Sequence, residues 1–313
     1  MTTTIIVAVV FLSISRPVIF KVDSVKLDKK ANANTLKKYV KYLSNDLYPR
    51  NLSNRKNYRL ASAFIEKKFR ENGCKIQIQE YLVGKDVHRN VICIEEGSSN
   101  KVIVVGAHYD SFYQTPGADD NASGVAGIIE LSRLLRNSNL GKSVYLVAYD
   151  TEEPPYFNTT AMGSYKHAQL MSEKGEDVVL MISLEMIGYF TEEGGIQKYP
   201  HFLMKLIYPS KGDFIAIVDQ FASNYGYKLK KLMLESMHDK VMSLNLPTKF
   251  PGVSYSDHMN YWKFGYSAVM VTDTAFYRNE YYHDTRDTFE RLDYKRMARV
   301  VNGVYLAIID ICN

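Results

Sequence analysis

The sequence is poor in cysteine and tryptophan and contains no internal repeat. Its three cysteines, Cys74, Cys93 and Cys312, are too few and too scattered for a disulfide framework, and no Cys-x-x-Cys pair indicates a thiolate zinc site. Basic residues exceed acidic ones only by 39 to 34 and are spread along the chain, so nothing favours nucleic-acid binding. The remaining composition, 46% hydrophobic and 23% charged over 313 residues, is typical of one large globular domain.

No apolar run is long enough to cross a bilayer unaided, but residues 5–12 form a compact run of signal-peptide length. No basic residue precedes it and no clear small-residue cleavage site follows it. We interpret residues 1–30 as a leader, either an export signal or an amino-terminal anchor, and residues 31–313 as a single domain. The alternatives are an ordinary first strand or a disordered leader. The expected location is therefore periplasmic, extracellular or membrane-anchored through the leader alone, and a cytoplasmic location stays open.

Potential metal ligands follow a predicted strand at residues 101–105. His108 and Asp110 come at the carboxyl end of this β-branched run, where open α/β sheets place their sites. Asp119 and Asp120 follow in a loop of small residues that leads into an apolar helix. Imidazole and carboxylate groups gathered in this way favour a divalent metal site. A helix cap and a polar strand end would explain the same residues.

A second predicted strand, at 144–149, ends in two adjacent acids, Glu152 and Glu153, followed by two prolines. Adjacent carboxylates repel each other unless a positive charge lies beside them, and a metal ion supplies that charge. Because neighbouring side chains of an extended segment diverge, one glutamate can bind the metal while the other acts as a general base toward its water. A solvated acidic turn is the alternative.

Two further strands complete the pattern. Glu185 lies within an apolar run at 178–188, where an unpaired carboxylate is costly to bury, so a metal or a basic partner is expected. His283 follows an apolar strand at 267–273. Four strand ends thus each deliver a metal-type side chain, which makes coincidence a poor explanation.

The order of elements predicts an α/β fold in three layers, with a mixed, mostly parallel β-sheet covered by helices on both faces. Apolar spacing predicts helices at 36–47 and 60–73 and a final helix at 297–311 that closes the core. Two alternating runs between residues 75 and 95 predict an antiparallel pair that feeds the strand before His108.

Loops at 192–213 and 244–252 are expected to lie over the pocket, where substrate choice is usually set. Tyr277, Tyr281 and Tyr282 either line that pocket or pack against the core.

The consecutive residues Ser256, Asp257 and His258 invite a serine-hydrolase interpretation. That interpretation is weak, because triad members meet across a fold and the sequence has no Gly-x-Ser-x-Gly elbow. Four further histidines lack the context of a ligand and are expected to lie on the surface or to be locally paired: His88, His167, His201 and His238.

Taken in order, the motifs resemble those of metallopeptidase family 28. They are His-x-Asp, Gly-Ala-Asp-Asp-Asn-x-Ser-Gly, Glu-Glu, Leu-Glu-Met-Ile-Gly and His-x-Thr-x-Asp-Thr, and the likeness extends from about Asn34 to the end of the chain. This is the co-catalytic zinc family of bacterial leucyl aminopeptidases, glutamate carboxypeptidase and animal-type glutaminyl cyclases. The chain looks most like its bacterial single-domain members.

The resemblance implies two zinc ions per chain, which cobalt or manganese can replace. The implied ligands are His108 and Glu185 for one ion, Glu153 and His283 for the other, and Asp120 as the bridge between them. Glu152 matches the general base, and Asp110 matches the acid that orients His108. Asp257 lies in a segment that supports the site from behind. Position 185 departs from the family pattern, in which many members have aspartate.

The resemblance also implies an aminopeptidase that acts on a peptide or a small aminoacyl substrate through a metal-bridged water activated by Glu152. Asp110, Asp119 and Glu152 are expected to form a negative rim that favours a cationic amino terminus. The alternatives are a carboxypeptidase, a single-zinc glutaminyl cyclase and an inactive binding member. The cyclases line their pocket with tryptophans, whereas Trp262 is the only tryptophan here.

Overall fold

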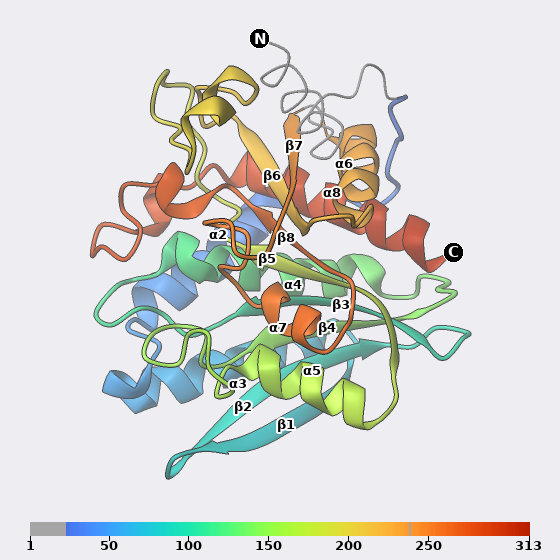
Figure 1. Ribbon diagram of the computed structural model, residues 1–313. Helices are drawn as coiled ribbons and strands as arrows, with labels where there is room; N and C mark the ends of the chain where they lie inside the picture. Colours follow the sequence, from blue (N-terminus) through green and yellow to red (C-terminus); the bar gives the residue numbers. More distant parts are fainter. Residues whose placement is uncertain (1–22, 238) are drawn as a thin grey trace.

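The computed structural model describes residues 23–237 and 239–313, so the apolar run at 5–12 and His238 lie outside the described residues. An eight-stranded sheet with the order β1-β2-β4-β3-β5-β8-β6-β7 runs through this part of the chain (Figure 1). The strands are β1 (Lys75–Val83), β2 (Asp86–Glu95), β3 (Lys101–His108), β4 (Ser143–Tyr149), β5 (Asp177–Glu185), β6 (Phe214–Gln220), β7 (Lys240–Leu246) and β8 (Ala268–Thr272). Strands β4, β3, β5 and β8 are mutually parallel, as are β6 and β7, while the pairs β1–β2, β2–β4 and β8–β6 are antiparallel. The predicted mixed, mostly parallel sheet is confirmed.

Helices cover both faces of this sheet, as predicted for a three-layer fold (Figure 1). One face carries α2 (Ala33–Lys41), α3 (Arg55–Glu71), α4 (Gly124–Leu135), α6 (Tyr225–Ser236) and α8 (Tyr294–Cys312). The other face carries α5 (Gly163–Glu173) and α7 (His258–Lys263). Alternate residues of β3 divide between the layers, since Ile103 and Val105 pack toward α4 and α8 whereas Val102 and Val104 pack toward α5 and α7. Burial on both faces explains the continuous apolar runs of the sequence.

The predicted helix at 36–47 is present in two parts. α2 begins after Asn32, whose side chain accepts hydrogen bonds from the backbone N–H groups of Asn34 and Thr35. It continues into a π-helical turn, Tyr42–Asp46, and the chain turns away before Pro49. The apolar face of α2, which includes Leu36 and Val40, therefore packs into the main hydrophobic core.

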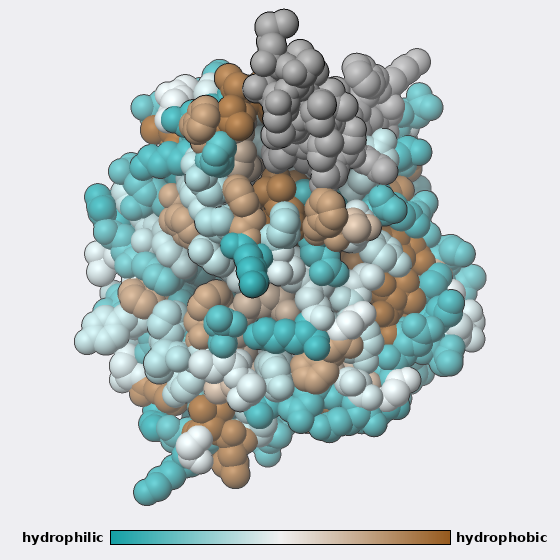
Figure 2. Space-filling model, viewed as in Figure 1, coloured by the Kyte–Doolittle hydropathy of each residue, from teal (hydrophilic) through white to brown (hydrophobic). Residues whose placement is uncertain are grey.

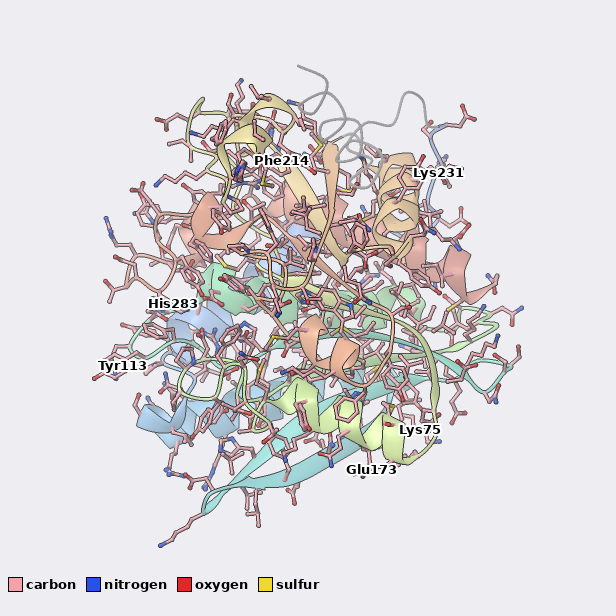
Figure 3. The ribbon with its side chains drawn as sticks, viewed as in Figure 1. Lys75, Tyr113, Glu173, Phe214, Lys231 and His283 are labelled. Carbon is pink, nitrogen blue, oxygen red and sulfur yellow. A yellow bond between two sulfur atoms is a disulfide. The ribbon has the colours of Figure 1, made fainter. Side chains whose placement is uncertain are left out.

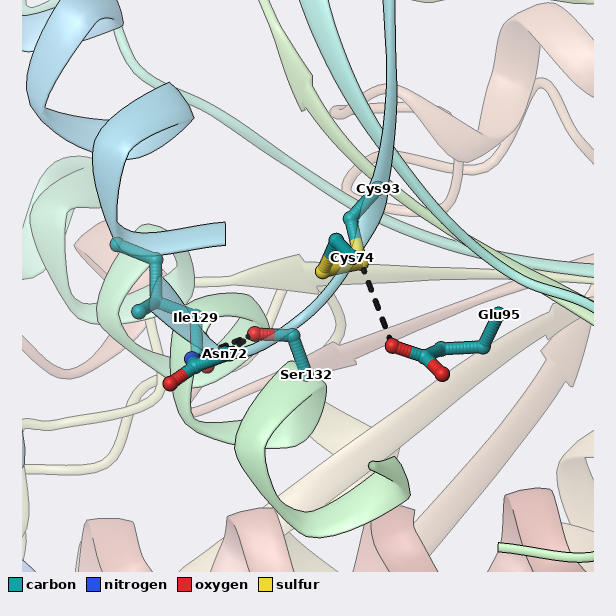
Figure 4. The surroundings of a disulfide bond; sticks show 6 residues. All are labelled: Asn72, Cys74, Cys93, Glu95, Ile129 and Ser132. Carbon is teal, nitrogen blue, oxygen red and sulfur yellow. Dashed lines mark hydrogen bonds between the residues drawn. A yellow bond between two sulfur atoms is a disulfide. The ribbon is translucent and has the colours of Figure 1, made fainter. Parts of the chain in front are cut away.

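A disulfide joins the start of β1 to β2 (Figure 4). The antiparallel register places Ile76 opposite Cys93, so Cys74 comes to a Cα separation of 5.2 Å from Cys93 and bonds to it. The expectation excluded only a framework of several disulfides, and the spacing of the cysteines does not indicate this single bridge, because pairing of the two strands brings the two residues together. Asn72, just before the bridge, donates to Ser132 of α4, so this corner is also tied to the helical layer (Figure 4).

The described chain before α2 lies along the helical layer. Val25 donates its backbone N–H to the carbonyl of Glu235, and Lys29 donates its ammonium group to the carbonyl of Leu134. Within residues 23–237 and 239–313, no helix is long and apolar enough to cross a membrane.

Candidate active site

The carboxyl ends of four adjacent parallel strands converge at one edge of the sheet. His108 is the last residue of β3 and Glu185 is the last residue of β5. Glu152 and Glu153 follow β4, and His283 follows β8. Because parallel strands end at the same edge, segments far apart in the chain deliver these side chains to one place. Figure 3 shows His283 on the same side of the molecule as Tyr113, which lies in the loop after β3.

The first group of side chains surrounds His108, which is completely buried. Its Nε2 atom lies 3.3 Å from Oδ1 of Asp120 and 3.4 Å from Oε2 of Glu185, and 3.9 Å from Oε2 of Glu152. Burial lowers the pKa of His108, but the nearby carboxylates of Glu185 and Glu152 outweigh it and raise the pKa well above the usual value. Ser256 donates its hydroxyl to Oε2 of Glu185 at 2.7 Å and so fixes that carboxylate.

The second group surrounds His283, whose side chain is 22% exposed. Its Nε2 atom lies 3.3 Å from Oδ2 of Asp120 and 3.2 Å from Oε2 of Glu153. Burial lowers the pKa of His283, but the contacts with Asp120 and Glu153 outweigh it and raise the pKa to about 9. Burial also raises the pKa of Glu153 to about 8.

Asp120 lies between the two groups and turns one oxygen toward each histidine. Its backbone N–H donates to Asp287 at 3.1 Å, and the following peptide bond to Asn121 is cis. Asn121 in turn donates its side-chain amide to the carbonyl of Leu184 at 2.8 Å. The acidic loop is thereby fastened to β5 on one side and to the segment after His283 on the other.

The two groups fit divalent zinc. Nε2 of His108, Nε2 of His283 and Oε1 of Glu153 are buried without a hydrogen-bond partner among the residues that the structure describes. Their nitrogen-to-oxygen separations of 3.2–3.4 Å match the roughly 3.3 Å between ligand atoms of a tetrahedral zinc with bonds of about 2.0–2.1 Å. A cation between these atoms would satisfy the orphaned groups and offset the mutual repulsion of the carboxylates.

Asp110 links the histidine to the paired glutamates. Its Oδ1 atom lies 3.2 Å from Nδ1 of His108, on the side of the ring away from the carboxylates. Its two oxygens also accept the backbone N–H groups of Glu152 and Glu153, at 3.2 and 2.9 Å. One buried carboxylate thus orients the imidazole and fixes the turn that carries both glutamates.

A family model described as Peptidase family M28 matches residues 90–308. The chain belongs to this family. YfbL of Escherichia coli K12 is 41% identical over 283 residues, which cover 88% of this chain and 87% of that protein. Leucine aminopeptidase 1 of Uncinocarpus reesii is 29% identical over 226 residues, which cover 67% of this chain and 51% of that protein. The chain therefore spans about half the length of that leucine aminopeptidase.

Solved structures share the fold of this M28 peptidase. A zinc aminopeptidase from Bacillus subtilis aligns with a TM-score of 0.71 at 13% identity, covering 90% of this chain and 95% of that one. A glutaminyl cyclase from Bacteroides thetaiotaomicron, bound to N-acetylhistamine, aligns with a TM-score of 0.68 at 18% identity, covering 90% and 99%. The fold is thus common to both activities, and the site must distinguish them.

Arg50, which sequence reasoning missed, supports the loops of this M28 site from beneath. It is completely buried, and its guanidinium group donates to four backbone carbonyls. The acceptors are Leu43, Tyr109, Pro116 and Gly117. Burial lowers the pKa of Arg50 to about 10, so the group stays charged at neutral pH. Its sequence context, after Tyr48 and Pro49, resembles a surface turn and gave no signal of this role.

The predicted negative rim is wrong in two of its three members. Asp110 and Asp119 are buried and do not line the cavity, which only Glu152 of the three faces. Asp119 accepts the backbone N–H of Gly188 and the side-chain amide of Asn279, both at 3.0 Å. Both carboxylates accept backbone N–H groups of neighbouring loops, because buried N–H groups require acceptors.

The serine-hydrolase interpretation fails as well. His258 uses Nε2 on the carbonyl of Val253 at 2.7 Å, and Ser256 is engaged with Glu185, so the three consecutive residues form no triad. Asp257 is buried near the first group, and burial raises its pKa to about 7. His88 and His167 pair locally with Asp150 and Tyr261, and His201 accepts a backbone N–H in its own loop, as expected.

A cavity of about 290 Å³ opens beside the two groups. Four carboxylates line one end: Asp120, Glu152, Glu153 and Glu185. The remaining wall is largely apolar, and the strands β6, β7 and β8 contribute Phe214, Ala216, Val218, Met242 and Met270 to it. Tyr277 and Tyr282 line the cavity, whereas Tyr281 is not among the described lining residues.

The two predicted pocket loops contribute to this wall, the first through Met204 and Tyr208 and the second through Pro251 and Gly252. On its outer side the first loop leaves Phe202 71% exposed. Figure 2 shows apolar surface at the top of the molecule over this loop.

Proposed function

We propose that this M28 peptidase is a two-zinc aminopeptidase that removes the amino-terminal residue from peptides. The observation that carries the proposal is the pair of imidazole and carboxylate groups that share Asp120 and border one cavity. The aminopeptidases among its relatives and structural neighbours support the same activity.

In this proposal, His108 and Glu185 hold one zinc ion, Glu153 and His283 hold the other, and Asp120 gives one oxygen to each. When bound, two zinc ions would lower the pKa of a water molecule and polarise the scissile carbonyl. Asp110 accepts from Nδ1 of His108 and so leaves Nε2 free to face the metal.

Glu152 is the general base of the proposed reaction. It lines the cavity but lies farther from Nε2 of His108, at 3.9 Å, than Asp120 and Glu185 do, so it belongs to neither ligand group. Burial raises the pKa of Glu152 well above that of an ordinary carboxyl group. A carboxylate of raised basicity suits the transfer of a proton from the attacking water to the leaving amine.

The described lining of the cavity offers no buried basic side chain to hold the carboxyl terminus of a substrate. Four carboxylates line one end, whereas Lys198 is the only lysine or arginine among the described lining residues and is exposed. Two zinc ions would balance the charge of these four carboxylates, so a substrate carboxylate would find no excess positive charge at this end, whereas an uncharged or ammonium-bearing amino terminus needs none. The apolar wall of β6, β7 and β8 suits an apolar side chain on the residue to be removed.

Peptides with blocked ends test this proposal. We expect acetylation of the amino terminus to abolish cleavage and amidation of the carboxyl terminus to leave it intact; the reverse would indicate a carboxypeptidase. The unchelated protein should contain two zinc ions per chain. One zinc ion, together with cyclisation of an amino-terminal glutamine, would indicate a glutaminyl cyclase instead.

We also propose that the enzyme matures in an oxidising compartment, because disulfides such as Cys74–Cys93 persist in exported proteins and are rare in the cytosol. Polar substitutions in the apolar run at 5–12 should retain the protein in the cytoplasm with all three thiols free after denaturation. The wild-type protein should yield one free thiol, that of Cys312. Equal thiol counts in the two samples would contradict this location.

A further inference from the structure

The two histidines of the site differ in the contacts of Nδ1, the ring nitrogen that points away from the proposed metal. Nδ1 of His108 lies 3.2 Å from Oδ1 of Asp110. For Nδ1 of His283, no hydrogen-bond partner occurs among residues 23–237 and 239–313. A histidine that binds a metal needs its ring held in one orientation, commonly by a hydrogen bond from the second nitrogen. Contacts of the ring faces can serve the same purpose for His283.

Two aromatic rings enclose the His283 ring. The ring centroid of Phe112 lies 3.8 Å away with an interplanar angle of 2°, and that of Tyr282 lies 3.8 Å away at 17°. Two near-parallel rings at the same distance cannot share one face, so Phe112 and Tyr282 stack on opposite faces of His283. Tyr282 is the neighbour of His283 in sequence, whereas Phe112 comes from the loop after β3.

The backbone at Phe112 is itself fixed. Its carbonyl accepts hydrogen bonds from both the backbone N–H and the hydroxyl of Thr115, at 2.9 and 2.6 Å. The preceding carbonyl, that of Ser111, accepts the side-chain amide of Asn51 at 2.8 Å. Phe112 therefore presents a pre-positioned surface to His283.

We propose that Phe112 is a positioning residue for the zinc ion held by His283. The inference rests on the proposed two-zinc function and extends it to a residue outside the ligand set. Stacking on both faces restricts rotation of the imidazole and keeps Nε2 directed at Asp120 and Glu153, 3.3 and 3.2 Å away. The same loop thus serves both histidines, through a carboxylate at Asp110 and a ring at Phe112.

Stepwise zinc binding tests the proposal. Zinc affinity is measured by chelator competition on the metal-free full-length wild-type protein and on Phe112→Ala, Phe112→Leu and Phe112→Tyr. A His283→Ala reference identifies which binding step belongs to the His283 side. We expect Phe112→Ala and Phe112→Leu to weaken that step about 10- to 100-fold and to leave the other within about twofold, as is typical when a group that orients a ligand is lost.

Two variants separate positioning from general loosening. Phe112→Tyr keeps the ring and should restore the wild-type constant, whereas Phe112→Leu keeps much of the volume without the ring. Tyr113→Ala, in the same loop and 72% exposed, should leave both steps unchanged. Wild-type constants in Phe112→Ala and Phe112→Leu, or equal weakening of both steps, would overturn the role of Phe112. A wild-type protein that binds fewer than two zinc ions would instead overturn the proposed function.

Discussion

His108 and His283 meet the same chemical requirement by different physical means. His108 is fully buried, and a carboxylate two residues along the chain lies beside its second ring nitrogen. His283 is partly exposed and is held between the rings of Phe112 and Tyr282. A hydrogen bond contributes most where water cannot compete, whereas ring stacking depends less on full burial. The buried ring of His108 is therefore oriented by a polar contact, and the partly exposed ring of His283 by packing.

The largest difference between the two sides is expected from substituting the adjacent glutamates, because Glu152 lies toward His108 and Glu153 toward His283. Glu152→Gln should retain both zinc ions and lose about 100- to 10,000-fold in turnover, as expected for loss of a general base. Glu153→Gln should lose zinc from the His283 side as well as activity. The measurement is kcat together with zinc content on the same samples, and identical behaviour of the two variants would contradict the division of roles.

Arg50→Met should damage both sides at once, because Arg50 holds the loop that carries Asp110 and Phe112. The substitution strands four buried carbonyls, including those of Tyr109 and Gly117, and should lower the free energy of unfolding by about 3 kcal/mol or more. Urea denaturation measures the loss. Exposed Arg59 is the matched control, and Arg59→Met should change stability by less than about 0.5 kcal/mol.

Features that depend on neighbouring residues in the sequence are predictable from it. The alternation and apolar runs of β3, β4, β5 and β8 predict the sheet, and strand ends predict where His108, Glu185 and the paired glutamates meet. These are local signals, and the three-layer fold follows from them. The role of Asp110 beside His108 is implied by the family resemblance rather than by the strand pattern.

Contacts between distant segments carried no such signal. Phe112 and His283 are 171 residues apart in the sequence and meet only because β3 and β8 end at the same edge. The sequence around Arg50 is typical of a surface turn, but the loop after β3 covers its side chain in the folded chain. Cys74 and Cys93 pair through strand register. The expected rim includes Asp110 and Asp119 because a sequence does not show which carboxylates accept buried N–H groups.

A smaller effect is expected when Asp110, the carboxylate beside His108, is altered. Asp110→Asn keeps the size of the side chain but replaces one acceptor by an amide, so Nδ1 of His108 and the N–H groups of Glu152 and Glu153 lose a shared carboxylate. Zinc binding on the His108 side should weaken about 10- to 100-fold. Combining Asp110→Asn with Phe112→Ala should give nearly additive losses in stepwise zinc affinity, because each residue supports a different ring. A large non-additive term would mean that the loop couples the two sides.

The smallest expected effect is a pH dependence of the metal-free protein. Burial lowers the pKa of His283, but Asp120 and Glu153 outweigh it and raise the pKa to about 9 in the folded chain, against about 6.5 in an unfolded one. A raised histidine pKa stabilises the fold fully below pH 6.5, and this contribution is lost as the pH rises toward 9. Burial likewise raises the pKa of Glu153 from 4.5 to about 8, so this carboxyl group lowers the stability of the metal-free fold as the pH rises from about 4.5 to about 8, a window that only partly overlaps that of His283. Since His283 is partly exposed, solvent reduces the combined loss to about 1–2 kcal/mol.

Thermal or urea unfolding at pH 6.5 and at pH 9, with and without zinc, measures this loss. Zinc-loaded protein should not show it, because neutral imidazole and ionised carboxylate are the forms that bind the ion. His283→Gln is the control and should reduce the pH dependence of the metal-free protein to the part that comes from Glu153, since glutamine does not titrate. A metal-free protein that is more stable at pH 9 than at pH 6.5 would contradict the charge pairing of His283 and leave packing by Phe112 and Tyr282 as its only support.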